Sequence, residues 1–167
     1  MKRLSTVAAL LVAALILLFL DFYTKAWAYS FLPLTSNGLR EIPIFHDFLG
    51  VDFSITLALN RGVAWGMLSS FQEIILVLRI LVIAGMLSYL FFFPHDRKRE
   101  IPLVLIVTGA LGNVIDYFIY GQVVDFLRFN LWGYPFPIFN LADSLITIGV
   151  CAFFLVSFFQ KQKAQAV

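Results

Sequence analysis

Apolar positions along the chain gather into four long stretches that polar segments separate. The stretches lie within residues 4–28, 72–93, 101–121 and 139–160. A helix rises 1.5 Å per residue, so about 20 apolar residues cross a bilayer core of about 30 Å. The first stretch is nearly pure apolar over Leu4–Leu20, which is a little short for a span, so its helix is expected to continue to Ala28. We therefore expect one integral membrane domain, residues 1–167, with four transmembrane helices.

The long segment between the first two stretches (29–71) has a different periodicity. In Val51–Asn60, apolar residues occupy every odd position and mostly polar or small residues every even one, the period of a half-buried strand. Glu41–Phe48 is a candidate partner strand, which Pro43 restricts to an edge. Asn60-Arg61-Gly62 then predicts a turn. The expected fold class is an all-α membrane protein with a small outer-face β-sheet, and 122–138 as a second outer loop.

Composition agrees with a membrane protein. Hydrophobic residues make up 61% of the 167 positions and charged residues 13%, against about 25% charged in soluble domains. A net charge of +2 without a basic stripe argues against nucleic acid as a partner. The single cysteine, Cys151, allows no disulfide within the chain and no cysteine-based metal site. His46 and His95 form no HExxH pattern, which argues against a zinc protease.

The basic residues predict the orientation. They cluster before the first stretch, between the second and third, and after the fourth: Lys2, Arg3, Arg97, Lys98, Arg99, Lys161 and Lys163. With four spans, all three clusters fall on one side, which the positive-inside rule assigns to the cytoplasm. Both termini are then cytoplasmic, and the two outer loops hold few basic residues.

A cleavable signal peptide is an alternative for the first stretch. Lys2-Arg3, an apolar run and Ala26-Trp27-Ala28 follow the order of a leader with an A-x-A end. Asp21, Lys25 and several aromatic side chains make the region before Ala26 bulky for such a site. The intact mass of the mature protein distinguishes the two.

Asp125 and Asp143 are the candidate catalytic residues. A charged acid at mid-membrane costs about 3 kcal/mol on insertion scales, so such acids mostly face a protein interior. The height of each acid above the inner end of its helix follows from the rise per residue. It is about 27 Å for Asp143, about 23 Å for Asp116 and at most about 36 Å for Asp125. The short connection between the last two helices makes them neighbours. Asp125 and Asp143 can then meet near the outer interface and share one proton.

Each of these acids also has a structural interpretation. Asp143 fits the third helical position after an Asn140 cap, on the positive end of the helix dipole. Asp125 fits a solvated loop acid. Asp116 fits a hydrogen-bonded pair with Asn113, three residues earlier in the same helix.

Other intramembrane polar and small residues predict close packing. Asp21 and Lys25 are four residues apart and fit a structural ion pair. Gly109 and Gly112 allow a neighbouring backbone to approach closely. Arg79, inside the second stretch, needs an acid or carbonyl partner that the sequence does not identify.

Two other function classes remain open from the residues alone. Clustered acids in a small bundle also suit a proton or cation carrier, although they gather at one interface and no inverted repeat is evident. A non-catalytic assembly subunit would tolerate loss of both acids. Among intramembrane proteases, the GxGD and GxSG elements are absent from the sequence, and Ser144 has no evident Lys or His base.

Several motifs, in order, resemble those of the bacterial lipoprotein signal peptidase (signal peptidase II) family across nearly the whole chain. They are Asp21–Lys25 (DFYTK), Asn60–Trp65 (NRGVAW), Gly109–Asp116 (GALGNVID), Gly121–Phe126 (GQVVDF) and Phe139–Ser144 (FNLADS). The resemblance implies an aspartic endopeptidase that cuts diacylglyceryl-modified prolipoproteins just before the lipidated lipobox cysteine. It also implies that the predicted sheet is the family's outer β-cradle.

Residue roles follow from the same resemblance. The catalytic pair is Asp125 and Asp143, the substrate-binding residues are Asn60, Gly62, Asn113 and Asn140, and the structural polar residues are Asp21, Lys25 and Asp116. No metal or cofactor is expected. The expected partners are the lipid-modified prolipoprotein and the phospholipid bilayer, and the chain is expected to be monomeric in the bacterial cytoplasmic (inner) membrane, with the active site near the outer face.

Two positions depart from the family pattern. Most members have Arg after the third-helix Asp, where this chain has Tyr117, and many have Gln where it has Phe22. Tyr can donate a hydrogen bond but carries no positive charge. Arg61 and Arg128 are the sequence candidates to supply the missing charge.

Overall fold

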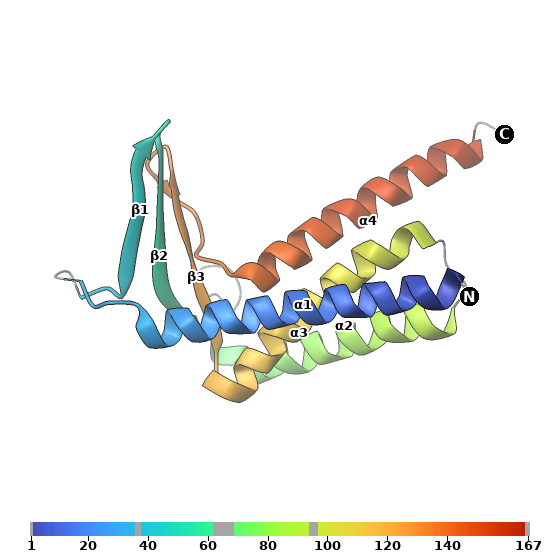
Figure 1. Cartoon of the computed structure of the whole chain (residues 1–167), viewed down its shortest axis with the longest axis horizontal. Coiled ribbons are helices and arrows are strands. Elements are labelled where there is room, and N and C mark those ends of the chain that lie inside the picture. Colours follow the sequence, from blue (N-terminus) through green and yellow to red (C-terminus); the bar gives the residue numbers. More distant parts are fainter. Residues whose placement is uncertain (1, 36–37, 62–68, 94–96, 166–167) are drawn as a thin grey trace.

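The chain forms a helical bundle with a small sheet standing across one end (Figure 1). The computed structural model describes residues 2–35, 38–61, 69–93 and 97–165, and places their side chains except at residues 2–6, 69 and 163–165. Both ends of the described chain lie on the side of the molecule away from the sheet, with the end of α4 apart from the start of α1.

Four helices in the described residues are long and apolar enough to cross a membrane, which confirms the expected fold class. They are α1 (Lys2–Phe31), α2 (Gln72–Phe92), α3 (Glu100–Tyr120) and α4 (Leu141–Gln165), with short 3-10 segments at Ser69–Phe71 (η2) and Arg97–Arg99 (η3). Large apolar side chains such as Leu15, Phe19, Val77 and Phe154 are exposed on the outside of the bundle. A bilayer rather than water is the solvent that suits this surface.

Helix α3 is the central element of the bundle, since α1, α2 and α4 all pack against it. Its small residues permit this packing, as the sequence predicted. A Cβ on Gly109 would collide with the backbone carbonyl of Ala142 in α4, and one on Gly112 would lie 2.5 Å from Asp21 Oδ2 in α1. The two glycines therefore bring three helices together at one level, the level of the buried polar residues.

The sheet has four antiparallel strands in the order β1-β2-β3-β4. They are β1 (Glu41–Phe48), β2 (Val51–Asn60), β3 (Val123–Leu131) and β4 (Tyr134–Pro135). The first two have the predicted bounds, and β1 lies at an edge, where Pro43 removes no ladder bond from a central strand.

Strands β3 and β4 were not predicted from the sequence, which indicated only an outer loop at 122–138 between two membrane spans. Helix α3 ends at Tyr120, and Gly121 takes a left-handed conformation (φ 71°) that reverses the chain. Strand β3 has apolar residues on both faces, so its period-two alternation is weak in the sequence. Asp125 therefore lies in the β2–β3 ladder and not on a continuation of α3.

Three sets of contacts fix the sheet to the helices. Ala28 and Leu32 of the α1 end pack against Phe126 of β3 in a buried apolar cluster. The guanidinium of Arg40 donates to the backbone carbonyls of Tyr29 and Ser30 in the last turn of α1 and to that of Leu32 just after it. The side-chain amide of Gln72, at the start of α2, donates to the Gly121 carbonyl at 2.6 Å. The sheet therefore has a defined position over the bundle end.

Candidate active site

Asp125 is a buried strand residue, so its interpretation as a solvated loop acid is wrong. It lies opposite Ala58 of β2 in the β2–β3 ladder and is 3% exposed. Its Oδ1 accepts from Asn140 Nδ2 at 2.8 Å and its Oδ2 accepts from Asn60 Nδ2 at 3.1 Å. Two amide donors thus orient the carboxyl group without adding a charge.

Asp143 lies in the first turn of α4, where the predicted cap is present. Its backbone N–H donates to Asn140 Oδ1 at 2.9 Å, and its own Oδ2 accepts from the Asn140 backbone N–H at 3.3 Å, a reciprocal capping pair. Its Oδ1 also accepts from Asn113 Nδ2 of α3 at 2.8 Å. The side chain is only partly buried, so the capping role leaves it accessible for chemistry.

Asn140 connects the two acids. Its side-chain amide donates to Asp125, while its backbone N–H and its side-chain oxygen bind Asp143. The same side chain is fully buried and also lies 3.1 Å from Asn113 Oδ1. Strand β3 and helix α4 therefore present their carboxyl groups to one shared residue, which brings Asp125 and Asp143 into the same site.

A buried lysine supports this site from the α1 side. Lys25 Nζ lies 2.7 Å from Asp21, 2.9 Å from Asp116 and 3.0 Å from Asn113 Oδ1. Because an ammonium can only donate, it holds the Asn113 oxygen toward itself and the Asn113 amide toward Asp143. The predicted Asp21–Lys25 pair is present, and Lys25 also binds Asn113, which is itself a neighbour of the candidate dyad.

Asp116 has different partners from those predicted. It binds Lys25 and accepts from the Val124 backbone N–H at 3.1 Å, whereas Asn113 is bound by Lys25, Asp143 and Asn140. The expected Asn113–Asp116 pair is therefore wrong, because the two side chains point to different neighbours from successive turns of α3. Asp21 similarly accepts from the Ala142 backbone N–H at 2.8 Å.

The surroundings of Asp125 favour its protonated form. Burial, and after it the neighbouring charge of Asp143, raise the pKa of Asp125 to about 7. The hydrogen bonds from Asn60 and Asn140 and the charge of Lys25 act against this rise. Asp125 can therefore retain a proton near neutral pH beside a second carboxylate.

Arg79 is a charged neighbour of the site that sequence reasoning left without a partner. It lies on α2 one turn from Leu76 and Ile83, which pack on α3. Its guanidinium interacts electrostatically with both Asp143 and Asp125. Neither sequence candidate for this charge takes that place: Arg61 donates to Gln122, and Arg128 pairs with Glu41 on the sheet.

Two other predicted positions have simpler outcomes. Gly62, a predicted substrate-binding residue, lies outside the described residues. Tyr117 is partly buried, and its ring packs edge-on against Phe118 at 5.8 Å between centroids. The α3 position that usually holds Arg in the resembled family thus holds a neutral aromatic side chain.

Comparison with known proteins agrees with this geometry. The sequence profile of a family described as "Signal peptidase (SPase) II" matches residues 13–159. A lipoprotein signal peptidase of Chlamydia pneumoniae is 42% identical over 106 residues, which are 62% of this chain and 63% of that relative, less than two thirds of its length. A lipoprotein signal peptidase of Pelodictyon phaeoclathratiforme (strain DSM 5477 / BU-1) is 38% identical over 146 residues, 82% of each chain. A solved bacterial membrane enzyme superposes with a TM-score of 0.80 at 27% identity, covering 93% of this chain and 91% of the other.

Proposed function

This chain belongs to the signal peptidase II family, and we propose that it removes signal peptides from lipid-modified lipoprotein precursors with Asp125 and Asp143 as an aspartic catalytic pair. The chain is a multi-pass protein of a bacterial membrane and a member of a protease family. The proposed cut lies just before the diacylglyceryl-modified cysteine. One observation carries the assignment of the pair: Asn140 hydrogen-bonds to both carboxyl groups.

The proposed reaction begins with a water molecule between the two carboxyl groups. The ionised member takes a proton from the water, and the resulting oxygen nucleophile attacks the scissile carbonyl carbon. The protonated member donates a hydrogen bond to the carbonyl oxygen as negative charge develops there. Because burial and the charge of Asp143 raise the pKa of Asp125 to about 7, the pair can hold one shared proton near neutral pH.

The second half of the reaction returns the protons. The tetrahedral intermediate collapses, the C–N bond breaks, and a carboxyl group protonates the departing amine of the lipidated cysteine. The signal peptide leaves with a new carboxylate. The pair ends with one proton, as it began. Since the two acids titrate as a unit, measured pKa values belong to the pair.

The location of the site suits a substrate anchored in lipid. Asp125 and Asp143 lie where the sheet meets the bundle, while Arg97, Lys98, Arg99 and Lys161 lie at the other end. By the positive-inside rule, we place that basic end and both termini in the cytoplasm and the site near the outer face. Lipid tails can then remain in the bilayer while the peptide bond reaches the acids. One chain supplies both acids, so we propose a monomeric enzyme.

Arg79 is the proposed source of positive charge at the site. Two carboxyl groups that share one proton carry one negative charge, and a cation within electrostatic reach stabilises that state. In this chain the charge comes from α2 rather than from the α3 position of Tyr117. In the same proposal, Asn60, Asn113 and Asn140 orient the acids through their hydrogen bonds, and Asn60, the last residue of β2, contacts the incoming peptide.

A cleavage assay tests the proposed function. The purified protein, incubated with a lipidated prolipoprotein, should yield a shorter product whose new N-terminus is the lipidated cysteine. The same precursor without diacylglyceryl is the control and should be cut much more slowly. A lipidated precursor that stays intact would overturn the proposal. Proton or cation flux into liposomes without any cleavage would favour the carrier alternative, although the acids gather at one end of the bundle instead of forming a path across it.

A further inference from the structure

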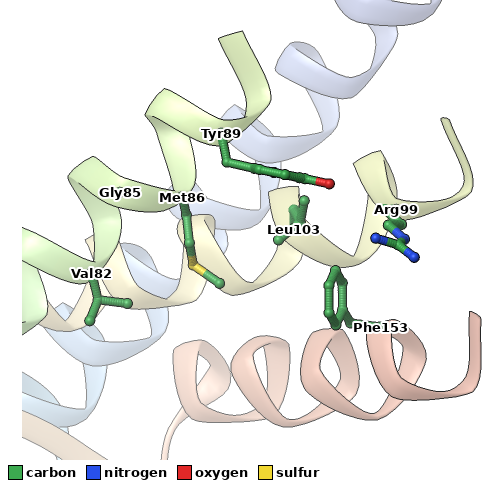
Figure 2. Close-up of a pocket in the computed structure, with 7 residues that line it drawn as sticks. All are labelled: Val82, Gly85, Met86, Tyr89, Arg99, Leu103 and Phe153. Carbon is green, nitrogen blue, oxygen red and sulfur yellow. The ribbon is translucent and has the colours of Figure 1, made fainter. Parts of the chain in front are cut away.

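A groove lies between α2 and α4, well away from the candidate dyad. Its volume is about 430 Å³. Residues of α2, of the segment that begins α3 and of α4 line it: Val82, Gly85, Met86, Tyr89, Arg99, Leu103 and Phe153. Figure 2 shows Leu103 and Arg99 on the helix segment between the α2 residues and Phe153 of α4. Phe153 is ten residues beyond Asp143 along α4, so the groove is about 15 Å from the catalytic level.

The walls of the groove suit a narrow apolar chain. Val82, Gly85, Met86 and Tyr89 recur every three or four residues, so they share one face of α2. Gly85 leaves open space on that face, since a Cβ added there would meet nothing within 4 Å. Leu103 of α3 and Phe153 of α4 supply the other apolar surfaces. The helices that form these walls are candidate membrane spans, so acyl chains are the medium around the groove.

The end of the groove away from the sheet carries a fixed positive charge. Arg99 Nε and Nη2 donate to Gln160 Oε1 of α4 at 3.2 and 2.8 Å, and the guanidinium lies 5.7 Å from the centre of the Phe153 ring. Neither bond to Gln160 uses Nη1. Arg97 and Lys98, exposed in η3, add two more positive charges beside it.

We propose that this groove binds an anionic phospholipid, with one acyl chain along Val82–Tyr89 and the phosphate on Arg99 and its basic neighbours. The apolar length and the charged end match the two parts of such a lipid. Basic pockets between transmembrane helices bind anionic headgroups, and guanidinium groups form strong charge-assisted bonds with phosphate oxygens. The bound lipid would join α2 to α4 where Figure 1 shows the two helices apart.

Native mass spectrometry of the purified full chain in detergent tests this site. Phosphatidylglycerol should bind at least fivefold more tightly than phosphatidylcholine with the same acyl chains. Inorganic phosphate alone should not displace it, because the acyl chain contributes to binding. Equal affinity for the two lipids, or displacement by inorganic phosphate, would overturn the proposal. Displacement by a lipidated substrate peptide in a one-to-one ratio would assign the groove to the substrate and overturn it as well.

Matched variants separate the site from general attraction to anionic lipid. Arg99→Gln should weaken phosphatidylglycerol binding about fivefold to tenfold, and Arg99→Lys, which keeps the charge, should restore much of it. Lys161→Gln removes one positive charge from the same end of the bundle and should have little effect. Equal losses in Arg99→Gln and Lys161→Gln would indicate surface attraction alone.

A second pair of variants tests the acyl-chain part. Gly85→Leu projects into the groove without an internal clash and should weaken binding of both lipids, whereas Ala84→Leu, exposed on another face of α2, should not. Unchanged binding in a folded Gly85→Leu protein would remove the acyl chain from the groove. Melting temperatures within a few degrees of the parent would show that each variant is folded.

Discussion

Asn140 donates its side-chain amide to Asp125 Oδ1 at 2.8 Å while it caps the helix that carries the second acid. One residue thus joins the end of the sheet to the start of α4. A shift of α4 against β3 would break either the Asp125 bond or the cap. The spacing of the proposed catalytic pair therefore depends on these hydrogen bonds of Asn140. Their role can be tested without changing either acid.

Replacing Asn140 with alanine should impair both stability and catalysis. The lost helix cap costs about 1 kcal/mol, and misplacing a catalytic group by about 1 Å can cost about 100-fold in rate. We expect Asn140→Ala to lower kcat about 100-fold with a modest fall in Tm. Ser144→Ala is the matched control, because Ser144 binds only the Asn140 carbonyl in this turn and should keep near-normal kcat. A folded Asn140→Ala enzyme within twofold of the parent kcat would contradict this function of Asn140.

The pH dependence of cleavage should reflect the raised pKa of Asp125. The reaction needs one proton on the pair, and an acid with a raised pKa keeps its proton up to higher pH. Since the pKa of Asp125 is about 7, activity should fall as the pH rises through about 7. The groups that act on it are Asp143 of α4, Lys25 of α1 and Arg79 of α2. A kcat/KM profile that stays flat from pH 5 to pH 9 would refute a shared proton.

The alkaline limb of the pH profile is the fall in activity above about pH 7. Arg79→Gln should move this limb to higher pH. Removing a nearby cation makes ionisation of the pair less favourable, so the second proton is lost later. Arg79→Lys keeps the charge and should return the limb toward the parent position. The exposed Arg61, whose guanidinium donates to Gln122, gives a control: Arg61→Gln should leave the limb in place. The same limb in Arg79→Gln and the parent enzyme would exclude electrostatic action of Arg79 on the pair.

The buried Lys25, Asp21 and Asp116 should contribute to the stability of the protein cooperatively. Lys25→Met leaves Asp21 and Asp116 buried without their cation, which costs about 3–5 kcal/mol. Asp116→Asn should be less harmful alone, and the double variant should lose less stability than the two single losses added together. Thermal melting in detergent would give this coupling, expected at about 1–3 kcal/mol. Additive effects would mean that the 2.9 Å contact between Lys25 and Asp116 contributes no energy of its own.

Much of the fold could be predicted because its signals are local. Four apolar runs identified the helices, and the period of two in Val51–Asn60 identified β2. Strand β3 was missed because Val123–Leu131 has apolar residues on both faces and directly follows a membrane helix. The left-handed Gly121 and the β-branched pair Val123-Val124 were the available signals. They are weak because glycine and valine also occur within membrane helices.

The site residues that belong to a local sequence motif could be predicted. The contacts that depend on how the helices pack against one another could not. Asn140 as a cap follows from its place before α4, and the Asp21–Lys25 pair follows from a spacing of four. The partners of Asp116 and Arg79 depend on which faces of α1, α2 and α4 meet α3, and no local pattern contains that information. Lys25 was predicted as half of an ion pair, but its bond to Asn113 joins residues 88 positions apart.

Cleavage of a lipidated prolipoprotein by Asp125→Asn and Asp143→Asn is the most direct measurement of the central claim. Both variants keep the size of the side chain, so each should insert and fold with a Tm close to the parent. Each should lower the cleavage rate at least about 1,000-fold, because an amide can neither take a proton from water nor supply one to the leaving amine. Parent-level cleavage by either folded variant would show that the two carboxyl groups held by Asn140 are not the catalytic pair.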